Sequence, residues 1–429
     1  MITSPAFKNR KFALLGLARS GLAAAKSLAA GGAELLAWDN DECARVKVAD
    51  IATIANPLDV DLSRYDGIVV SPGVPINRHP IADKAKAEGI PLIGDIELFS
   101  MARPDLPPHR VIGITGTNGK STTTALVHHL LKSAALPTRM AGNIGMPILS
   151  QPPLPAGGVY VIELSSYQID ITHSLACEAA ALINLSPDHL DRYDGYEGYM
   201  ASKARLFGMQ TAKQHSVFGK GDEDTYRIYN AVLAKRGSGV VHLADPALVV
   251  GQSDWPSLQG PHNLQNVAVA IKLVEALGIT EAQWRPAFRS FKGLAHRMEI
   301  VAERNGVLFV NDSKATNPAS TAPALAAYPR VHWIVGGLPK GDDLDECAPN
   351  FGHVVKAYTI GEAGPLFSRL LSPHMPVESS EMMGAAVHSA ASQALPGDVI
   401  MLSPACASFD QFKDFEARGD AFKAIVAAL

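Results

Sequence analysis

The stretch Val111-Ile-Gly-Ile-Thr-Gly-Thr-Asn-Gly-Lys-Ser-Thr-Thr-Thr124 decides the fold of this chain. Its first four residues form a short apolar run, which predicts a buried strand of a parallel sheet. A glycine-containing turn follows, and the residues from Thr122 onward are expected to continue as a helix. A buried strand that leads through a glycine turn directly into a helix is typical of α/β folds.

The turn also has the composition of a phosphate-binding loop. Backbone N–H groups of such a turn and the positive end of the following helix face an anion together. Gly116 and Gly119 let the backbone approach phosphates, Lys120 can reach the terminal ones, and the Ser121 hydroxyl suits Mg²⁺. The pattern departs from a full P-loop at Ile114, where a glycine is expected. A corner without a ligand is the alternative, but Gly-Lys-Ser at a helix start is a costly arrangement without an anion.

Composition limits the classes of function. A length of 429 residues suggests three domains at roughly 150 residues each. The 47% hydrophobic and 19% charged content is that of a soluble globular protein, and the net charge of −4 argues against a nucleic-acid partner. No apolar run approaches the roughly 18 residues of a membrane span. Four cysteines without CxxC spacing indicate reduced thiols, so we expect a cytoplasmic protein.

The N-terminal part, residues 11–94, alternates between strand and helix patterns. Its first turn, Gly16-Leu-Ala-Arg-Ser-Gly21, is a GxGxxG fingerprint with Ala18 in place of the middle glycine, and Asp39 ends the second strand. Taken alone, this arrangement predicts a Rossmann unit that binds a dinucleotide. An NAD-dependent oxidoreductase is therefore one hypothesis, although it leaves the phosphate-binding loop unexplained.

Acidic residues lie within one further predicted strand of the central part, over residues 158–168, and after another. Glu163 lies within an apolar run over residues 158–168, where a carboxylate needs an ion-pair partner or a metal ion. The strand over 180–185 leads into Asp188-His-Leu-Asp191, which alone would be read as an acidic surface turn. Beside the phosphate-binding loop, Mg²⁺ is the better partner for Glu163. The turn over 188–191 is then better read as part of a ligand site, because open α/β sheets bind ligands at the carboxyl ends of their strands. Residues 210–258 show only strand and turn patterns.

Three segments resemble those of the Mur ligase family: Gly116 to Thr122, Asn311-Asp-Ser-Lys-Ala-Thr-Asn317 and Ser403-Pro-Ala-Cys-Ala-Ser-Phe-Asp410. The resemblance runs from about residue 10 to the C-terminus, and the last two segments favour the D-glutamate-adding branch over a ligase for another amino acid. It implies three α/β domains: a Rossmann-like UDP-sugar domain (1–94), a P-loop ATPase-like central domain (95–293) and a Rossmann-like amino-acid domain (294–429). It also implies ATP and Mg²⁺ as cofactors. The implied substrates are UDP-N-acetylmuramoyl-L-alanine and D-glutamate, in a cytoplasmic monomer that makes peptidoglycan precursors.

The resemblance assigns residues to the nucleotide and the metal. Lys203 alone would be read as a solvated helix residue, and Asn266 as part of a helix cap; in the family the matching lysine is carbamylated, which makes it an anionic ligand. Catalytic roles fall to Lys120, His189, Lys203 and Lys314. Mg²⁺ is expected on Ser121, Glu163, His189 and Lys203. ATP is expected on Gly116, Thr117, Asn118, Gly119, Lys120, Ser121, Thr122, Asn266, Arg297 and Asp312.

The substrates are assigned in the same way. Asp41 stands where related enzymes can carry a basic residue beside the UDP-sugar. A cation and hydroxyl groups facing a dicarboxylate make physical sense. The UDP-sugar is expected on Arg19, Ser20, Asn40, Gly73 and Asn143, and glutamate on Thr316, Lys340, Ser408 and Phe415.

Overall fold

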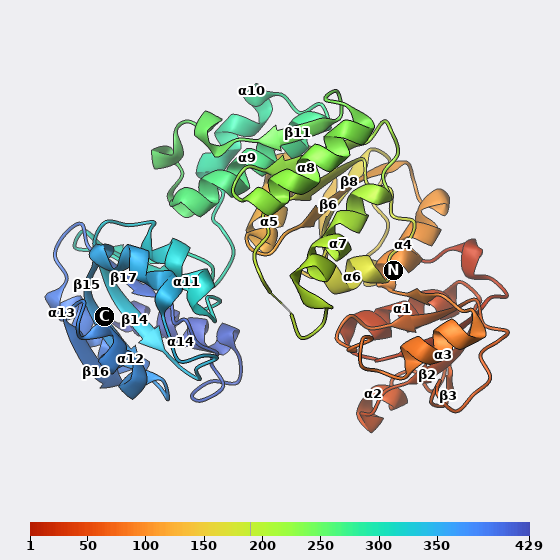
Figure 1. The fold of residues 1–429 in the computed structure, drawn as a ribbon, viewed down its shortest axis with the longest axis horizontal. Helices are drawn as coiled ribbons and strands as arrows, with labels where there is room; N and C mark the ends of the chain where they lie inside the picture. The colour runs from red at the N-terminus through yellow and green to blue at the C-terminus, as the bar shows by residue number, and fades with distance from the viewer. Residues whose placement is uncertain (189) are drawn as a thin grey trace. The chain divides into compact units, whose positions relative to one another are not determined.

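The computed structural model describes residues 1–188 and 190–429, so His189, expected at the metal, lies outside the described residues (Figure 1). The described chain contains three β-sheets. Contacts divide it into two compact units: Met1–Asp245 with Ala268–Arg285, and Pro246–Val267 with Pro286–Leu429. The first unit holds two of the sheets and the second unit holds one. The domain limits at residues 94 and 293 stay predictions.

The first sheet has the strand order β3-β2-β1-β4-β5, and all its pairs are parallel. Its central strand is buried from Phe12 to Leu15, as expected for a parallel sheet covered on both faces. Its strands are β1 (Lys11–Leu15), β2 (Glu34–Trp38), β3 (Thr53–Ile54), β4 (Gly67–Val70) and β5 (Leu92–Ile93). The associated helices are α1 (Arg19–Ala30), α2 (Glu42–Val46), α3 (Ile81–Glu88) and α4 (Asp95–Ala102).

The second sheet, also parallel, has the order β11-β10-β9-β6-β8-β7. Strand β6 lies between β9 and β8, so the loop after β6 emerges beside the carboxyl ends of both neighbours. The strands are β6 (His109–Thr115), β7 (Thr138–Gly142), β8 (Gly158–Glu163), β9 (Ala179–Leu182), β10 (His215–Gly219) and β11 (Val241–Ala244). The helices are α5 (Lys120–Ser133), α6 (Ser166–Asp170), α7 (Gly195–Gly208), α8 (Glu223–Arg236), α9 (Pro261–Ala276) and α10 (Glu281–Trp284).

Three predictions for this part are wrong in detail. Helix α5 begins at Lys120 rather than Thr122, because Gly119 takes a left-handed conformation (φ 80°) and forms the N-cap. Strand β8 ends at Glu163, because Ser165 caps helix α6 in a capping box. Residues 210–258 contain helix α8, whose N-cap Asp222 accepts a hydrogen bond from the backbone of Thr225 at 2.7 Å.

One hydrophobic cluster runs through the first unit, from Ile2 to Val241, and includes buried side chains from both sheets. In the second unit, alternate residues of one strand point to opposite faces of the sheet: Trp333 and Val335 pack in one cluster and Ile334 in another.

Among the described residues, no helix has both the length and the apolar composition needed to cross a bilayer.

The third sheet has the order β12-β13-β17-β14-β15-β16, with only the β12–β13 pair antiparallel. The sequence pattern predicts four strands in this part, over residues 306–311, 331–336, 354–361 and 398–403, and the structure confirms them as β13, β14, β15 and β17. The edge strands β12 and β16 lack long apolar runs, so the sequence pattern missed them. The strands are β12 (Glu299–Arg304), β13 (Val307–Asn311), β14 (Val331–Gly336), β15 (Val354–Ile360), β16 (Val377–Glu381) and β17 (Val399–Leu402). The helices are α11 (Pro318–Leu325), α12 (Gly364–Leu371), α13 (Met383–Gln393) and α14 (Phe415–Ala428).

Candidate active site

The loop after β6 has the backbone geometry of an anion site. Gly116 and Gly119 have positive φ angles of 152° and 80°, and a Cβ at Gly116 would lie 3.2 Å from the Cβ of Ile183. Asn184, which sequence reasoning missed, anchors the loop: its carbonyl oxygen accepts from Thr117 N at 3.0 Å and its side-chain oxygen accepts from Asn118 N at 2.8 Å. These two bonds fix the loop at the start of α5, and the positive end of a helix favours an anion.

Lys120 lies over this loop. Its Nζ donates to the carbonyl oxygens of Gly116 at 2.9 Å and Thr117 at 2.7 Å. The ammonium group is therefore held against the loop that the sequence predicts to bind phosphates. A cation so placed can neutralise charge on a phosphoryl group in transfer.

Glu163 has an incompletely satisfied carboxylate. It is the last residue of β8 and only 1% exposed, and its Oε1 accepts from Asn143 Nδ2 at 3.1 Å. Its Oε2 is buried and, within residues 1–188 and 190–429, has no hydrogen-bond partner. A buried carboxylate oxygen without a partner is costly unless a cation binds it. With the buried hydroxyl of Ser121 at the start of α5, these hard oxygen donors fit Mg²⁺.

Lys203 is buried beside the loop that follows β6. The helix pattern alone would not predict this burial. The Lys203 side chain is 1% exposed, and its Nζ donates to Gly116 O at 2.9 Å. Burial, and then the ammonium of Lys120, holds the pKa of Lys203 well below its usual value, although Asp188 and Glu163 act in the opposite direction. The structure thus brings Lys120, Glu163 and Lys203 together around the loop.

A separate cavity of about 370 Å³ opens beside the first turn of the chain. Four of the five predicted UDP-sugar residues line it: Arg19, Ser20, Gly73 and Asn143. Asn40 is not among the described residues that line it; its neighbour Asp39 does, and accepts from Leu17 N at 2.6 Å. Asp95 and Gln168, which sequence reasoning missed, also line the cavity.

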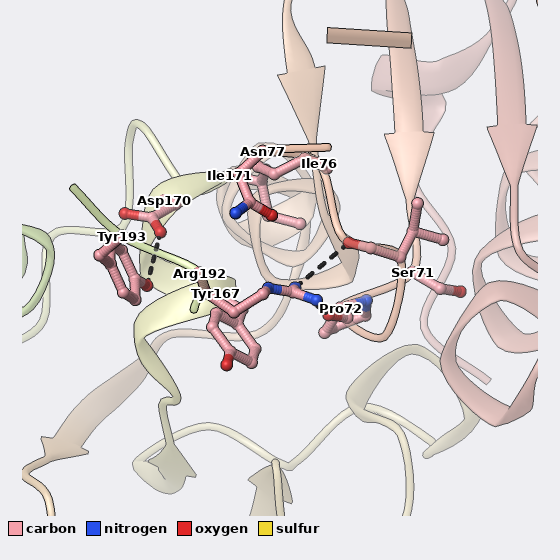
Figure 2. Close-up of a pocket in the computed structure, with 10 residues that line it drawn as sticks. Ser71, Pro72, Ile76, Asn77, Tyr167, Asp170, Ile171, Arg192 and Tyr193 are labelled. Carbon is pink, nitrogen blue, oxygen red and sulfur yellow. Dashed lines mark hydrogen bonds between the residues drawn. The ribbon is translucent and has the colours of Figure 1, made fainter. Parts of the chain in front are cut away.

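The turn that carries Gly73 is tied to the loop after β9. Figure 2 shows the Arg192 guanidinium stacked against the Tyr167 ring, at 4.1 Å from its centroid, and reaching toward the Ser71–Pro72 turn. Its Nη2 donates to Val74 O at 3.3 Å. Arg78 completes the connection in the other direction, since its Nη2 donates to Asp191 O at 2.8 Å. The cavity wall and the acidic loop after β9 are therefore physically linked.

Asp95 begins helix α4 and is 4% exposed. Its Oδ1 is buried and lacks a hydrogen-bond partner among the described residues. Burial raises the pKa of Asp95 from 3.8 to about 6, against the opposing effect of nearby backbone N–H groups. Because the native state holds this proton more tightly than the unfolded chain, ionisation of Asp95 destabilises the fold as pH rises from about 4 to 6.

We expect Asp95→Asn to raise the urea midpoint at pH 7.5 and to leave it nearly unchanged at pH 4. A pKa raised from 3.8 to about 6 corresponds to roughly 3 kcal/mol, which is the upper limit of the gain in the free energy of unfolding. The matched control is Glu97→Gln on the same helix. The Glu97 carboxylate is buried but accepts from His173 N, Ser174 N and Ser174 Oγ, so this variant should lose stability at pH 7.5. An equal gain for Asp95→Asn at both pH values would contradict the role of ionisation.

In the second unit, Asp312 follows β13 and is 6% exposed. It accepts from Ser403 Oγ at 2.8 Å and from Met298 N at 3.1 Å. Burial raises its pKa to about 7, although these hydrogen bonds and Arg297 oppose the shift. Asn266 is 3% exposed and donates to Asn263 Oδ1 at 3.1 Å. Both residues lie inside α9, so the alternative reading of Asn266 as part of a helix cap is wrong.

Three of the four predicted glutamate residues, Thr316, Lys340 and Ser408, come from loops at the carboxyl ends of β13, β14 and β17, and the fourth, Phe415, begins helix α14. Lys340 Nζ donates to Thr316 Oγ1 at 3.3 Å, so two of them are already in contact. Lys314 Nζ lies 3.9 Å from the centroid of the Phe415 ring. Ser408 is buried in the loop after β17, at 2% exposure.

Two family models match the chain: the Mur ligase middle domain over residues 114–247 and the Mur ligase glutamate ligase domain over residues 296–406. A UDP-N-acetylmuramoylalanine–D-glutamate ligase of Novosphingobium aromaticivorans is 67% identical over 429 residues, covering 100% of this chain and 97% of that protein. The protein of the same name from Sphingopyxis alaskensis is 54% identical, with 100% of both chains covered.

Solved structures share the fold at low identity. The UDP-N-acetylmuramate–alanine ligase of Thermotoga maritima superposes with a TM-score of 0.59 at 16% identity, covering 97% of this chain and 99% of that chain. The predicted fold class is therefore confirmed, with Rossmann-like first and last parts around a P-loop central part. Because two family models together match more than half of the 429 residues and relatives above 50% identity align along the whole length, this chain belongs to the Mur ligase family.

Proposed function

We propose that the chain is an ATP-dependent ligase that joins D-glutamate to UDP-N-acetylmuramoyl-L-alanine, in the cytoplasmic synthesis of peptidoglycan precursors. The observation that carries the chemistry is the meeting of three groups at one phosphate-type loop: Lys120, the buried Lys203 amine, and the Glu163 oxygen that has no hydrogen-bond partner among the described residues. The choice of substrates rests on the names of full-length relatives at 67% and 54% identity. We propose that the enzyme acts as a monomer.

The reaction requires an activated carboxyl group. The alanyl carboxylate attacks the γ-phosphorus of ATP, ADP leaves, and an acyl phosphate forms. The amine of D-glutamate then attacks the carbonyl carbon, inorganic phosphate leaves, and the nitrogen releases a proton. Lys120 supplies the positive charge at the phosphoryl group, and the chain contributes chiefly by positioning the reactants. Mg²⁺ held by Ser121, Glu163 and Lys203 would neutralise the phosphate oxygens.

Lys203 fits this role as a carbamate. Its low pKa, caused by burial, favours the neutral amine, whose nitrogen can attack the carbon of CO₂. A nitrogen–carbon bond forms, one proton leaves, and the side chain becomes anionic. An ammonium group beside Glu163 would repel Mg²⁺, whereas a carbamate oxygen can bind it.

A phosphate-release assay tests the proposed function directly. Phosphate should appear only when ATP, UDP-N-acetylmuramoyl-L-alanine and D-glutamate are all present, and omission of either substrate should stop it. Parallel assays with a panel of other amino acids distinguish this ligase from others in the family. Phosphate release with a different amino acid but not with D-glutamate would show that the proposed substrate is wrong.

We expect Lys340→Ala to raise the KM for D-glutamate roughly 10- to 100-fold, because a hydrogen bond to a charged group contributes about 1.5–3 kcal/mol. The KM for the UDP-sugar should change little, since its predicted residues line a cavity in the first unit. Lys413→Ala, an exposed lysine near the start of α14, is the control and should leave both constants unchanged. Equal increases of both KM values in Lys340→Ala would show that the glutamate site is misplaced.

A further inference from the structure

Arg418 is one of the largest fully buried side chains of the described chain, at 1% exposure. It lies in the first turns of α14, and no ion pair of the described residues includes it. Burial lowers the pKa of its guanidinium to about 10. Burying a charged group is costly unless its hydrogen bonds are satisfied, so the contacts of this side chain indicate what it is for.

Those contacts connect two loops at the carboxyl end of the third sheet. Arg418 Nε donates to Ser313 Oγ at 3.0 Å, and Nη2 donates to Ser313 O at 2.8 Å. On the other side, Nη2 donates to Cys406 O at 3.0 Å and Nη1 to Ala407 O at 3.1 Å. The planar fork of a guanidinium presents five donors in fixed directions, which allows one side chain to bind both loops.

A third loop joins the same point. Ala407 O also accepts from Leu338 N at 3.0 Å, and Ala407 N donates to Leu338 O at 3.0 Å. Gly337 packs so closely that a Cβ there would lie 3.0 Å from Arg418 Nη1 and 2.4 Å from Ala407 O. The loop that leads to Lys340 is therefore held through Ala407 to the guanidinium.

These three loops carry the residues proposed to bind the amino-acid substrate. Thr316 follows Ser313 by three residues, Lys340 follows Leu338 by two, and Ser408 follows Ala407 directly. The start of α14 is attached as well, since Ser313 Oγ donates to Phe415 O at 2.9 Å. A shift of one loop against another would change the spacing of the groups that face the two carboxylates of the substrate.

We propose that Arg418 is a positioning residue of the amino-acid pocket, which fixes the spacing of Thr316, Lys340 and Ser408 by binding their loops together. The inference rests on the proposed function, because the pocket is assigned by it. Arg418 acts through backbone carbonyls and one hydroxyl group. Lysine, a single ammonium on a flexible stem, cannot reproduce four bonds in these directions.

The experiment compares Arg418→Lys and Arg418→Ala with wild-type enzyme in the phosphate-release assay. We expect both variants to raise the KM for D-glutamate at least about 10-fold. The KM for UDP-N-acetylmuramoyl-L-alanine should stay within about twofold of wild type, because only the amino-acid pocket loses its fixed spacing. Millimolar methylguanidine should lower the D-glutamate KM of Arg418→Ala and leave that of the wild type unchanged. If Arg418→Ala does not fold, the KM values of Arg418→Lys are compared with those of the wild type.

The control is Arg330→Lys. Arg330 pairs with Asp398 and directly precedes β14, so it lies at the amino ends of the strands, away from the three loops that Arg418 binds. This variant should leave both KM values unchanged. An unchanged D-glutamate KM in Arg418→Lys, or equal increases for both substrates, would overturn the positioning role. If the wild-type enzyme uses another amino acid, the proposed function is wrong. The KM for that other amino acid, measured in the same variants, then tests the positioning role of Arg418.

Discussion

Replacing Lys120 by alanine is expected to reduce phosphate release by a factor of about 10²–10³ while the fold remains intact. The ammonium group donates to the carbonyl oxygens of Gly116 and Thr117 in its own loop, and Lys120 is not a member of the hydrophobic core, so we expect its removal to leave the packing of the core unchanged. In the transition state of phosphoryl transfer, however, the loss of one preorganised donor typically costs this factor. The measurements are steady-state phosphate release and the urea midpoint of the variant.

The matched control is Lys132→Ala, an exposed lysine in the last turn of the same helix. It removes the same charge at the other end of α5, so its activity should stay within about twofold of the wild type. If Lys120→Ala retained more than about a tenth of wild-type turnover, the loss would be less than ~1.4 kcal/mol. That result would remove Lys120 from the proposed phosphoryl-transfer site.

Lys203→Ala is expected to be nearly inactive, and Lys203→Arg equally so. The alanine variant lacks any metal ligand at this position, and the arginine variant keeps a positive charge that repels Mg²⁺. Short carboxylic acids should partly restore activity to Lys203→Ala, because they can place an anionic oxygen in the vacated volume. They should not rescue Lys203→Arg, in which the guanidinium fills that volume.

Removal of CO₂ provides a second test of the carbamate hypothesis, which uses the wild-type sequence. Wild-type enzyme kept in CO₂-free buffer should lose activity and regain it when bicarbonate is added. The control is Lys213→Ala, which replaces an exposed lysine two residues before the start of β10 and should behave like the wild type. A structure of the active enzyme with Mg²⁺ and nucleotide that shows an unmodified Lys203 would end the carbamate hypothesis.

Local sequence signals were sufficient for most elements of the three sheets. The apolar run before Gly116 and the strand from Val331 to Gly336 are short-range patterns, and the structure places them within a few residues of the prediction. The errors arose where a cap decided the boundary. Ser165 stops β8 at Glu163 by starting a helix, although the apolar pattern continues past it.

The sequence by itself therefore determined the α/β class, the phosphate-type loop and, through the resemblance, the candidate residues. Only the tertiary structure decided which polar groups are buried and what they contact. Lys203 reaches Gly116 across 87 residues of sequence, and Arg418 reaches Ser313 across 105. Periodicity reports one face of one helix, whereas burial of a charge depends on every element packed against it. For this reason Lys203 and Arg418 look like ordinary helix residues in the sequence and are fully buried in the fold.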